Sequence, residues 1–112
     1  MIESYKFGQM TINKKIYHSD LIIFKDHIDD QWWRKEGHNL HLDDIREMIN
    51  EKPESIIIGT GFYGLMKVPP EIKEYLESVG IKLIVKKTKD SCDDYNILHQ
   101  NKKVTAAFHL TC

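Results

Sequence analysis

Cysteine, proline and long apolar runs are all scarce in this sequence of 112 residues. The two cysteines, Cys92 and Cys112, are too few for the disulfide framework of a small secreted domain, so we interpret them as free thiols in a reducing cytosol. The apolar runs are much shorter than the roughly 20 residues needed to cross a bilayer. The start, MIESYKFGQM, lacks the basic and apolar segments of a signal peptide. These absences predict a cytoplasmic protein without a membrane partner.

An excess of charge of either sign is also absent, because 16 basic and 17 acidic side chains leave a formal net charge of −1. This balance does not favour nucleic acid. The segment Trp32-Trp33-Arg34-Lys35 joins aromatic rings to cations, as single-stranded nucleic-acid sites do. In a chain so close to neutral, a protein contact is the better interpretation, since Trp and Arg are common interface anchors. We therefore predict a protein partner at Trp32, Trp33 and Arg34, and no nucleic acid.

The composition is that of an ordinary globular domain, with 41% hydrophobic and 29% charged residues. A chain of this length can bury a core without disulfides or metals. No repeat, linker or low-complexity segment divides it. We predict a single domain over residues 1–112.

The N-terminal third is rich in strand-forming residues. Residues 4–12 have strand character, residues 16–25 (IYHSDLIIFK) predict a second strand, and residues 31–34 predict a short third strand. In that third strand, Trp32 and Trp33 would face opposite sides, so only one of them can enter the core. Together these strands predict a β-meander.

The rest of the chain alternates helices and strands. An aspartate at 43 or 44 can cap a helix that runs to residue 51, and the prolines at 69 and 70 can start another. Thr88 can cap a third helix through residue 99. Strands are expected at 55–58, 81–85 and 104–110, and the first is apolar on both faces like a central parallel strand. The predicted fold class is α/β: a β-meander, then αβαβαβ around a mixed, largely parallel sheet.

The stretch SIIIGTGFYG, residues 55–64, contains the G-x-G-x-x-G spelling of dinucleotide-binding loops. In a true fingerprint the glycines open the next helix, but here Leu65 to Val68 separate Gly64 from the two prolines. The next strand ends in Val85-Lys86-Lys87, without the acidic residue that would hold a ribose. We therefore expect no dinucleotide cofactor and interpret the glycines as a tight turn. A turn at the carboxyl end of a central strand can still line a ligand pocket.

Several histidines and a thiol offer two further interpretations. His38, His41, His109 and Cys112 contain enough donors for a zinc ion, but their spacing matches no known finger, so we predict no metal site. Cys112 with a histidine could act as a nucleophile if Asn96 oriented the base. The alternative is that Asn96 bonds backbone and that His109 and Cys112 belong to the edge of the core.

The assembled motifs resemble the small Mth-domain family. They are Phe7-Gly8, Asp20, Trp33-Arg34, Gly37-His38, the Gly59-Thr60-Gly61 turn, Tyr95-Asn96, and the closing Ala107-Phe108-His109-Leu110-Thr111-Cys112. Eukaryotic relatives include the adipogenesis-associated Mth domain-containing protein and a mitochondrial assembly factor for respiratory complex I. The resemblance covers essentially the whole chain and implies a compact α/β fold with a β-meander. It implies neither catalytic residues nor a cofactor.

Two functions are compatible with these observations. The first is a non-enzymatic binding or assembly module that uses Trp32, Trp33, Arg34, the glycine turn and the segment around His38. The second is an enzyme or small-ligand binder with a polar pocket formed by Gly59, Thr60, Gly61, His38, Asn96, His109 and Cys112. We favour the first function, and we expect no cofactor.

Overall fold

A computed structural model describes all residues, 1–112, as two sheets and a few short helices. The three-stranded sheet contains β1 (Ile2–Lys6), β2 (Gln9–Ile12) and β3 (Lys15–Tyr17). The five-stranded sheet has the order β5 (Ile28–Asp29), β4 (Leu21–Ile23), β8 (Val104–Phe108), β6 (Ser55–Gly59) and β7 (Lys82–Lys86). The helical elements are the 3₁₀ turn η1 (Leu42–Ile45), α1 (Arg46–Asn50), α2 (Pro70–Ser78) and α3 (Thr88–Leu98). None of the helices is long and apolar enough to cross a lipid bilayer.

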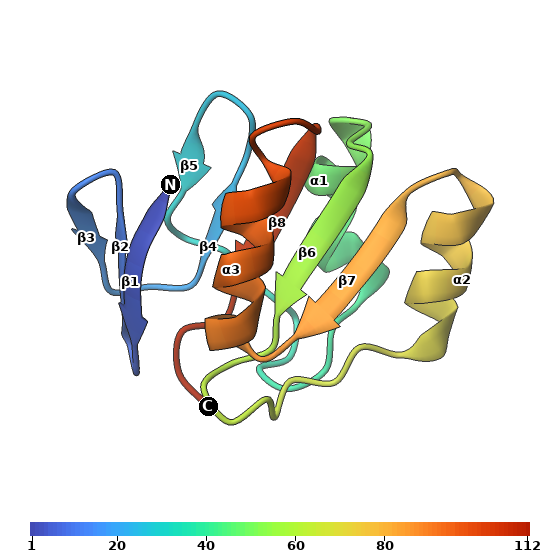
Figure 1. The fold of residues 1–112 in the computed structure, drawn as a ribbon. Coiled ribbons are helices and arrows are strands. Elements are labelled where there is room, and N and C mark those ends of the chain that lie inside the picture. The colour runs from blue at the N-terminus through green and yellow to red at the C-terminus, as the bar shows by residue number, and fades with distance from the viewer.

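The five-stranded sheet is mixed, as the alternation of elements predicts. β6 pairs in parallel with both β7 and β8, while β4 is antiparallel to β8 and to β5. The central strand β6 is buried along its length, and alternate residues enter two different cores: Ile56 and Ile58 on one face, Ile57 on the other. The α/β fold class is confirmed, and Figure 1 shows α3 over one face of this sheet with α1 behind the other.

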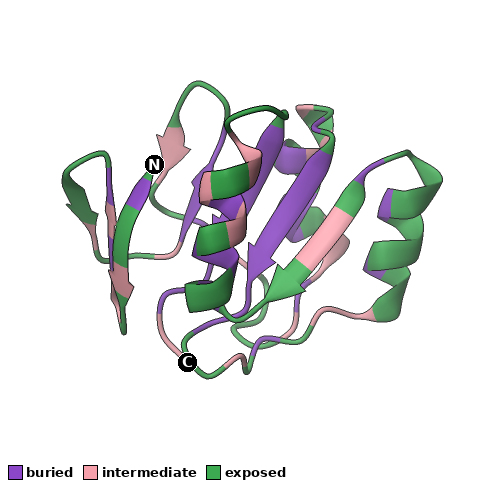
Figure 2. Ribbon diagram, viewed as in Figure 1, coloured by how far each residue is buried: buried purple, intermediate pink, exposed green.

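Each face of the sheet is covered by different elements. α1, α2 and the loop that carries Trp32 and Leu40 close one core. α3 and the three-stranded sheet close the other, where Met10 and Ile12 meet Phe108 and Leu110. In Figure 2 the buried residues are concentrated in β6 and β8, between these two layers. The strands that end at the glycine turn and the C-terminus are therefore held from both sides.

The first two strands predicted in the N-terminal third are each divided into two shorter strands in the structure. Residues 4–12 form a hairpin rather than one strand, because Gly8 adopts φ +74° and reverses the chain between β1 and β2. The predicted strand 16–25 is divided at residues 18–20, since β3 belongs to the three-stranded sheet and β4 to the other. Local β propensity does not distinguish these cases.

The predicted strand at residues 31–34 is wrong. The backbone N–H of Trp32 donates to the carbonyl oxygen of Asp20, and its indole N–H donates to the carbonyl oxygen of Asp44 at 2.9 Å. This loop conformation still separates the two rings: Trp32 is 7% exposed and Trp33 is 74% exposed. The prediction that only one tryptophan enters the core is confirmed, although the cause is not a strand.

Candidate functional site

The glycine turn, which follows the carboxyl end of β6, is tightly packed against neighbouring segments. A Cβ on Gly59 would lie 2.8 Å from both the Phe108 ring and the Ser91 hydroxyl. Gly61 has φ +108°, and a Cβ there would lie 2.7 Å from the carbonyl oxygen of Cys112. Both glycines are thus required by the close approach of α3 and the C-terminal residues.

The backbone amides of this turn are used inside the protein. Thr60 N–H donates to the Lys86 carbonyl at 3.0 Å, Gly61 N–H to the Thr88 hydroxyl at 2.9 Å, and Phe62 N–H to the Thr111 carbonyl at 2.7 Å. In a dinucleotide site such amides face the pyrophosphate. The next helix, α2, begins only at Pro70. The amides of the turn therefore connect it to β7, α3 and the C-terminal segment, and they do not face a site for a phosphate group.

Thr88 does not cap α3 as predicted. Lys87 occupies the N-cap position, and Thr88 is the first helical residue. The Thr88 hydroxyl accepts from Gly61 N–H and donates to the His109 carbonyl at 2.7 Å. It therefore ties the start of α3 to the glycine turn and to the C-terminal segment.

The C-terminal segment runs along the turn and brings His109 and Cys112 to it. His109 N–H donates to the Gly59 carbonyl at 3.0 Å, and Leu65 N–H donates to the Cys112 carbonyl at 3.3 Å. The thiol-bearing Cys112 is half-buried and free. The structure thus assembles Gly59, Gly61, His109 and Cys112 at one edge of the sheet, beside the C-terminus marked in Figure 1.

Asp20 holds this edge together through three hydrogen bonds. Its carboxylate lies 2.7 Å from His109 Nδ1, 2.8 Å from Arg34 Nη1 and 2.7 Å from the backbone N of Leu110. Burial alone would raise the pKa of Asp20, but the bonds from His109, Leu110 and Arg34 outweigh it and hold the pKa below its ordinary value. Arg34 also stacks on the Trp32 ring, with Cζ 4.6 Å from the ring centroid.

His109 has one committed nitrogen and one free nitrogen. Nδ1 lies 2.7 Å from the Asp20 carboxylate and 3.2 Å from Arg34 Nη2. Nε2 is buried without a hydrogen-bond partner. The exposed ring of His38 is near, with its centroid 6.3 Å from that of His109 in an edge-to-face arrangement. This is the one place where polar side chains from the predicted pocket meet.

Asn96 of the predicted pocket lies elsewhere, as does His41, which the sequence offers only as a possible metal donor. Asn96, on α3, accepts from the Ile2 N–H and donates to the Ile2 carbonyl, both at 2.8 Å, and so attaches the helix to β1. His41 pairs with Glu36 at 2.5 Å. No group of three or more His, Cys, Asp or Glu side chains is placed to hold a metal ion. The alternative interpretation of Asn96, a side chain that bonds to backbone groups, is therefore confirmed.

Of the three predicted partner contacts, only Trp33 reaches solvent. Trp32 lies in the core, and the Arg34 side chain is 6% exposed and bonded to Asp20. Both support the site from within, so a partner that uses this segment would meet the Trp33 ring.

An exposed aromatic patch, which sequence reasoning missed, lies at the same edge. It consists of Phe7, Phe62, Tyr63 and Leu65, all of them at least 40% exposed. The Phe7 and Phe62 ring centroids are 5.7 Å apart, and those of Phe62 and Tyr63 are 5.1 Å apart. The sequence does contain a signal for this patch: large apolar residues lie in a glycine-rich turn and at the tip of a hairpin, where a core does not need them.

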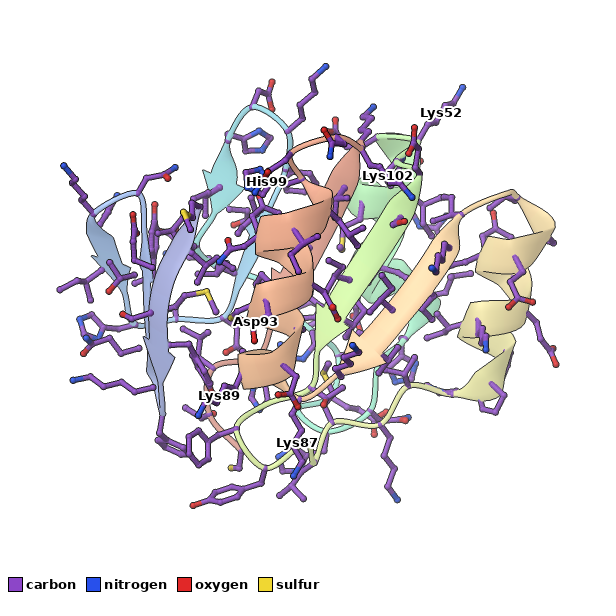
Figure 3. The ribbon with its side chains drawn as sticks, viewed as in Figure 1. Lys52, Lys87, Lys89, Asp93, His99 and Lys102 are labelled. Carbon is purple, nitrogen blue, oxygen red and sulfur yellow. The ribbon has the colours of Figure 1, made fainter.

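The patch has a basic border. A Cβ on Gly64 would lie 3.0 Å from Lys87 Cγ, so the Lys87 stem packs beside Gly64, the residue that follows Tyr63. Lys87 and Lys89 lie at the N-terminal end of α3, close to the glycine turn (Figure 3). Lys6 precedes Phe7 and is exposed. The patch thus has exposed apolar rings with lysines beside them.

Comparison with known proteins agrees with this fold. The profile described as "Protein of unknown function (DUF498/DUF598)" matches residues 2–109. Among solved structures, a conserved hypothetical protein, PH1505 from Pyrococcus horikoshii OT3, is 26% identical with a TM-score of 0.89, over 100% of this chain and 99% of that one. MT938 is 28% identical with a TM-score of 0.83, over 100% and 98% of the two chains.

A more distant neighbour carries the domain name that the motifs suggested. A protein of Bordetella pertussis, described as a Mth938-like domain, is 15% identical with a TM-score of 0.70, over 98% of this chain and 85% of that one. At this identity the likeness concerns the fold alone. The predicted resemblance to the Mth-domain family is confirmed.

Proposed function

Since the chain belongs to the DUF498/DUF598 family, whose description assigns no activity, we propose from its geometry that it is a non-enzymatic protein-binding or assembly module. The observation that supports this proposal is the aromatic patch. Four large apolar side chains from two segments, residues 7 and 62–65, gather in solvent on a tightly bonded turn. Rigid aromatic anchors of this kind dominate the binding energy of many protein interfaces.

The chemistry of the patch indicates the kind of surface it fits. Apolar rings call for an apolar recess, and the lysines at the rim call for carboxylates around it. The contact would lose little conformational entropy, because the turn is already held by the Thr111 and Cys112 carbonyls.

The free thiols of Cys92 and Cys112 support a reducing compartment such as the cytoplasm for this module.

The test is site-specific photo-crosslinking in the native host cells. A benzophenone amino acid replaces Tyr63 in one variant and Ile97 in another; Ile97 is 67% exposed but lies on α3, outside the patch. We expect one discrete protein crosslink at position 63 and none at position 97. The crosslink should disappear when Phe7→Ser and Phe62→Ser are added, with the unfolding midpoint unchanged. Equal products at both positions, or none at position 63, would overturn the proposal.

A second candidate function is an enzyme or small-ligand binder at the Gly59-Thr60-Gly61 turn. The unpartnered Nε2 of His109 favours it, because a buried polar atom without a hydrogen-bond partner is unusual. Native mass spectrometry of freshly purified protein tests it: a retained small molecule that is lost in His109→Gln would support it. A clean mass for both proteins would leave only the first function.

A further inference from the structure

The strand β7 forms one edge of the five-stranded sheet, and no strand pairs with its outer side. All of its residues are exposed or half-buried, whereas the neighbouring strand β6 is buried along its length. Val85 is 41% exposed. The opposite edge of the sheet is β5, a strand of two residues. The longer open edge of this sheet is therefore β7.

The hydrogen bonds between β6 and β7 use every second residue of β7. Lys82 N–H donates to the Glu54 carbonyl at 3.0 Å, and the parallel register repeats this pattern at residues 84 and 86. The N–H and C=O groups of Leu83 and Val85 therefore point away from β6, toward the open edge. One more strand could pair with these four groups.

The space beside the start of this edge is open. In Figure 1, α2 lies next to β7, and an open cavity of about 410 Å³ lies between them. The residues that line it are Lys73, Glu77, Gly80, Ile81, Lys82 and Leu83. Leu83 packs on the core that α2 covers, and Ile84 packs on the core that α3 covers. The side chains of an added strand would alternate between the same two faces, and one beside Leu83 would enter the cavity.

The charges along this edge are mainly positive. Two ion pairs lie beside it, Lys73 with Glu77 at 4.0 Å and Lys86 with Asp94 at 2.9 Å. Lys82 and Lys87, at the two ends of β7, are exposed and belong to no ion pair. Carboxylates on an added strand would complement these two lysines.

A second copy of the chain does not match this edge. If two β7 strands paired antiparallel about Ile84, Lys82 of each copy would lie opposite Lys86 of the other. Like charges directly opposite each other destabilise a strand pair, and lysines on an edge discourage association between identical sheets. The charges therefore favour a different, acidic chain.

We propose that the β7 edge binds an extended acidic segment of another protein by strand addition. Backbone hydrogen bonds to Leu83 and Val85 supply affinity, and the alternating side chains supply specificity. Acidic side chains of the segment lie on the α3 face, near Lys82 and Lys86–Lys87, and small apolar side chains lie on the α2 face. The edge does not include the aromatic patch, so this inference does not rest on the protein contact proposed there.

The test is an NMR titration of ¹⁵N-labelled full-length protein with the peptide acetyl-Glu-Val-Thr-Val-Glu-amide. In a strand of either direction, its acids fall on one face and its valines on the other. We expect amide shifts centred on Leu83 and Val85, and slower hydrogen exchange of these two amides in the complex. Acetyl-Lys-Val-Thr-Val-Lys-amide, with the same backbone and the opposite charge, should bind about fivefold more weakly.

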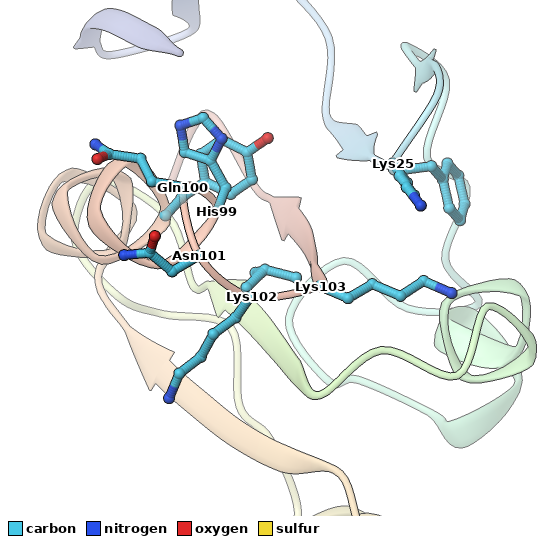
Figure 4. A pocket seen from close by; sticks show the side chains of 9 residues that line it. Lys25, His99, Gln100, Asn101, Lys102 and Lys103 are labelled. Atoms are coloured by element: carbon cyan, nitrogen blue, oxygen red, sulfur yellow. The ribbon is translucent and has the colours of Figure 1, made fainter.

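Three variants complete the test. Val85→Pro removes an outward N–H but no bond to β6, so the fold should persist while affinity for the acidic peptide falls about tenfold. Lys82→Glu should weaken the acidic peptide about fivefold and strengthen the lysine peptide. Lys25→Glu is the matched control, because Lys25 follows β4, across β8 and β6 from β7 (Figure 4), and should leave both affinities unchanged.

Three results with the peptides would overturn the proposal. They are no shift of any β7 amide at about 10 mM acidic peptide, equal binding of the two peptides, and equal responses of Lys82→Glu and Lys25→Glu. The protein without peptide gives a further check. A dimer in which the Leu83 and Val85 amides already exchange slowly would show that a second copy occupies the edge, and it would also overturn the proposal.

Discussion

The Asp20 carboxylate and the His109 imidazole lie 2.7 Å apart although 89 positions separate them in the sequence. This pair joins the segment before β4 to the end of β8. Together with Arg34 and the Leu110 N–H it closes the edge of the sheet on which the glycine turn and the aromatic patch lie. The side chains of Arg34, His109 and Asp20 are 6%, 8% and 20% exposed, so solvent screens the contacts only in part.

Asp20→Asn should therefore destabilise the protein substantially. It leaves the Arg34 guanidinium buried without its counter-charge, which costs about 2–4 kcal/mol of the free energy of unfolding. Urea unfolding followed by circular dichroism measures the change. Asp26→Asn is the control, because Asp26 pairs with a histidine at the surface. An equal shift of the urea midpoint in both variants would contradict the assignment.

The same carboxylate predicts a pH dependence. The folded-state pKa of Asp20 is lower than its unfolded value of about 3.9. Its contribution is thus fully present above about pH 4 and is lost as pH falls through the folded pKa. Urea midpoints measured from neutral pH down to about pH 2.5 should show the difference between the parent and Asp20→Asn narrowing on the acid side. A constant difference over that range would be inconsistent with this titration.

Gly61→Ala should disturb the glycine turn more than Gly37→Ala disturbs its loop. At Gly61 the positive φ and the Cys112 carbonyl at 2.7 Å both oppose a Cβ, whereas a Cβ on Gly37 meets nothing within 4 Å. We expect a loss of about 2–4 kcal/mol at position 61 and a change within about 0.5 kcal/mol at position 37. Thermal and urea unfolding of both variants provide the comparison. If the two variants were equally stable, the glycine turn would be able to accommodate a Cβ at position 61, and the prediction would be wrong.

The two cysteines should differ in reactivity. Burial, with a smaller effect from Asp93, raises the pKa of the Cys92 thiol to about 12, while Cys112 is half-buried near the end of the chain. With iodoacetamide at mildly alkaline pH, Cys92 should react roughly 100-fold more slowly than Cys112. Peptide mass spectrometry of timed samples measures both rates, and urea should abolish the difference. Similar rates in the folded protein would show that α3 opens readily.

Asn96→Ala tests whether Asn96 is structural. The change removes both side-chain bonds to Ile2 and should cost about 1–2 kcal/mol in unfolding free energy. Asn50→Ala, at an exposed helix position, is the matched control and should change stability by less than about 0.5 kcal/mol. Amide hydrogen exchange of β1 should also accelerate in Asn96→Ala. Unchanged exchange would contradict the tie between α3 and β1.

Local patterns in the sequence determined the order of elements over the C-terminal two thirds. Residues 55–58 are apolar on both faces, which is typical of a central strand. Pro69 and Pro70 are suited to the first turn of a helix, so the helix after this strand begins several residues beyond Gly64. The same patterns exclude a helix that opens at the glycines.

Tertiary structure alone decided where strands break and which side chains meet. Residues 16–25 have one composition but serve two sheets, and residues 31–34 form no strand because Trp32 bonds to Asp20 and Asp44 instead. The Asp20–His109 pair and the aromatic patch join residues far apart in sequence. Periodicity records only which face of an element is apolar, whereas these contacts depend on how the folded elements pack against one another, and no local pattern encodes that.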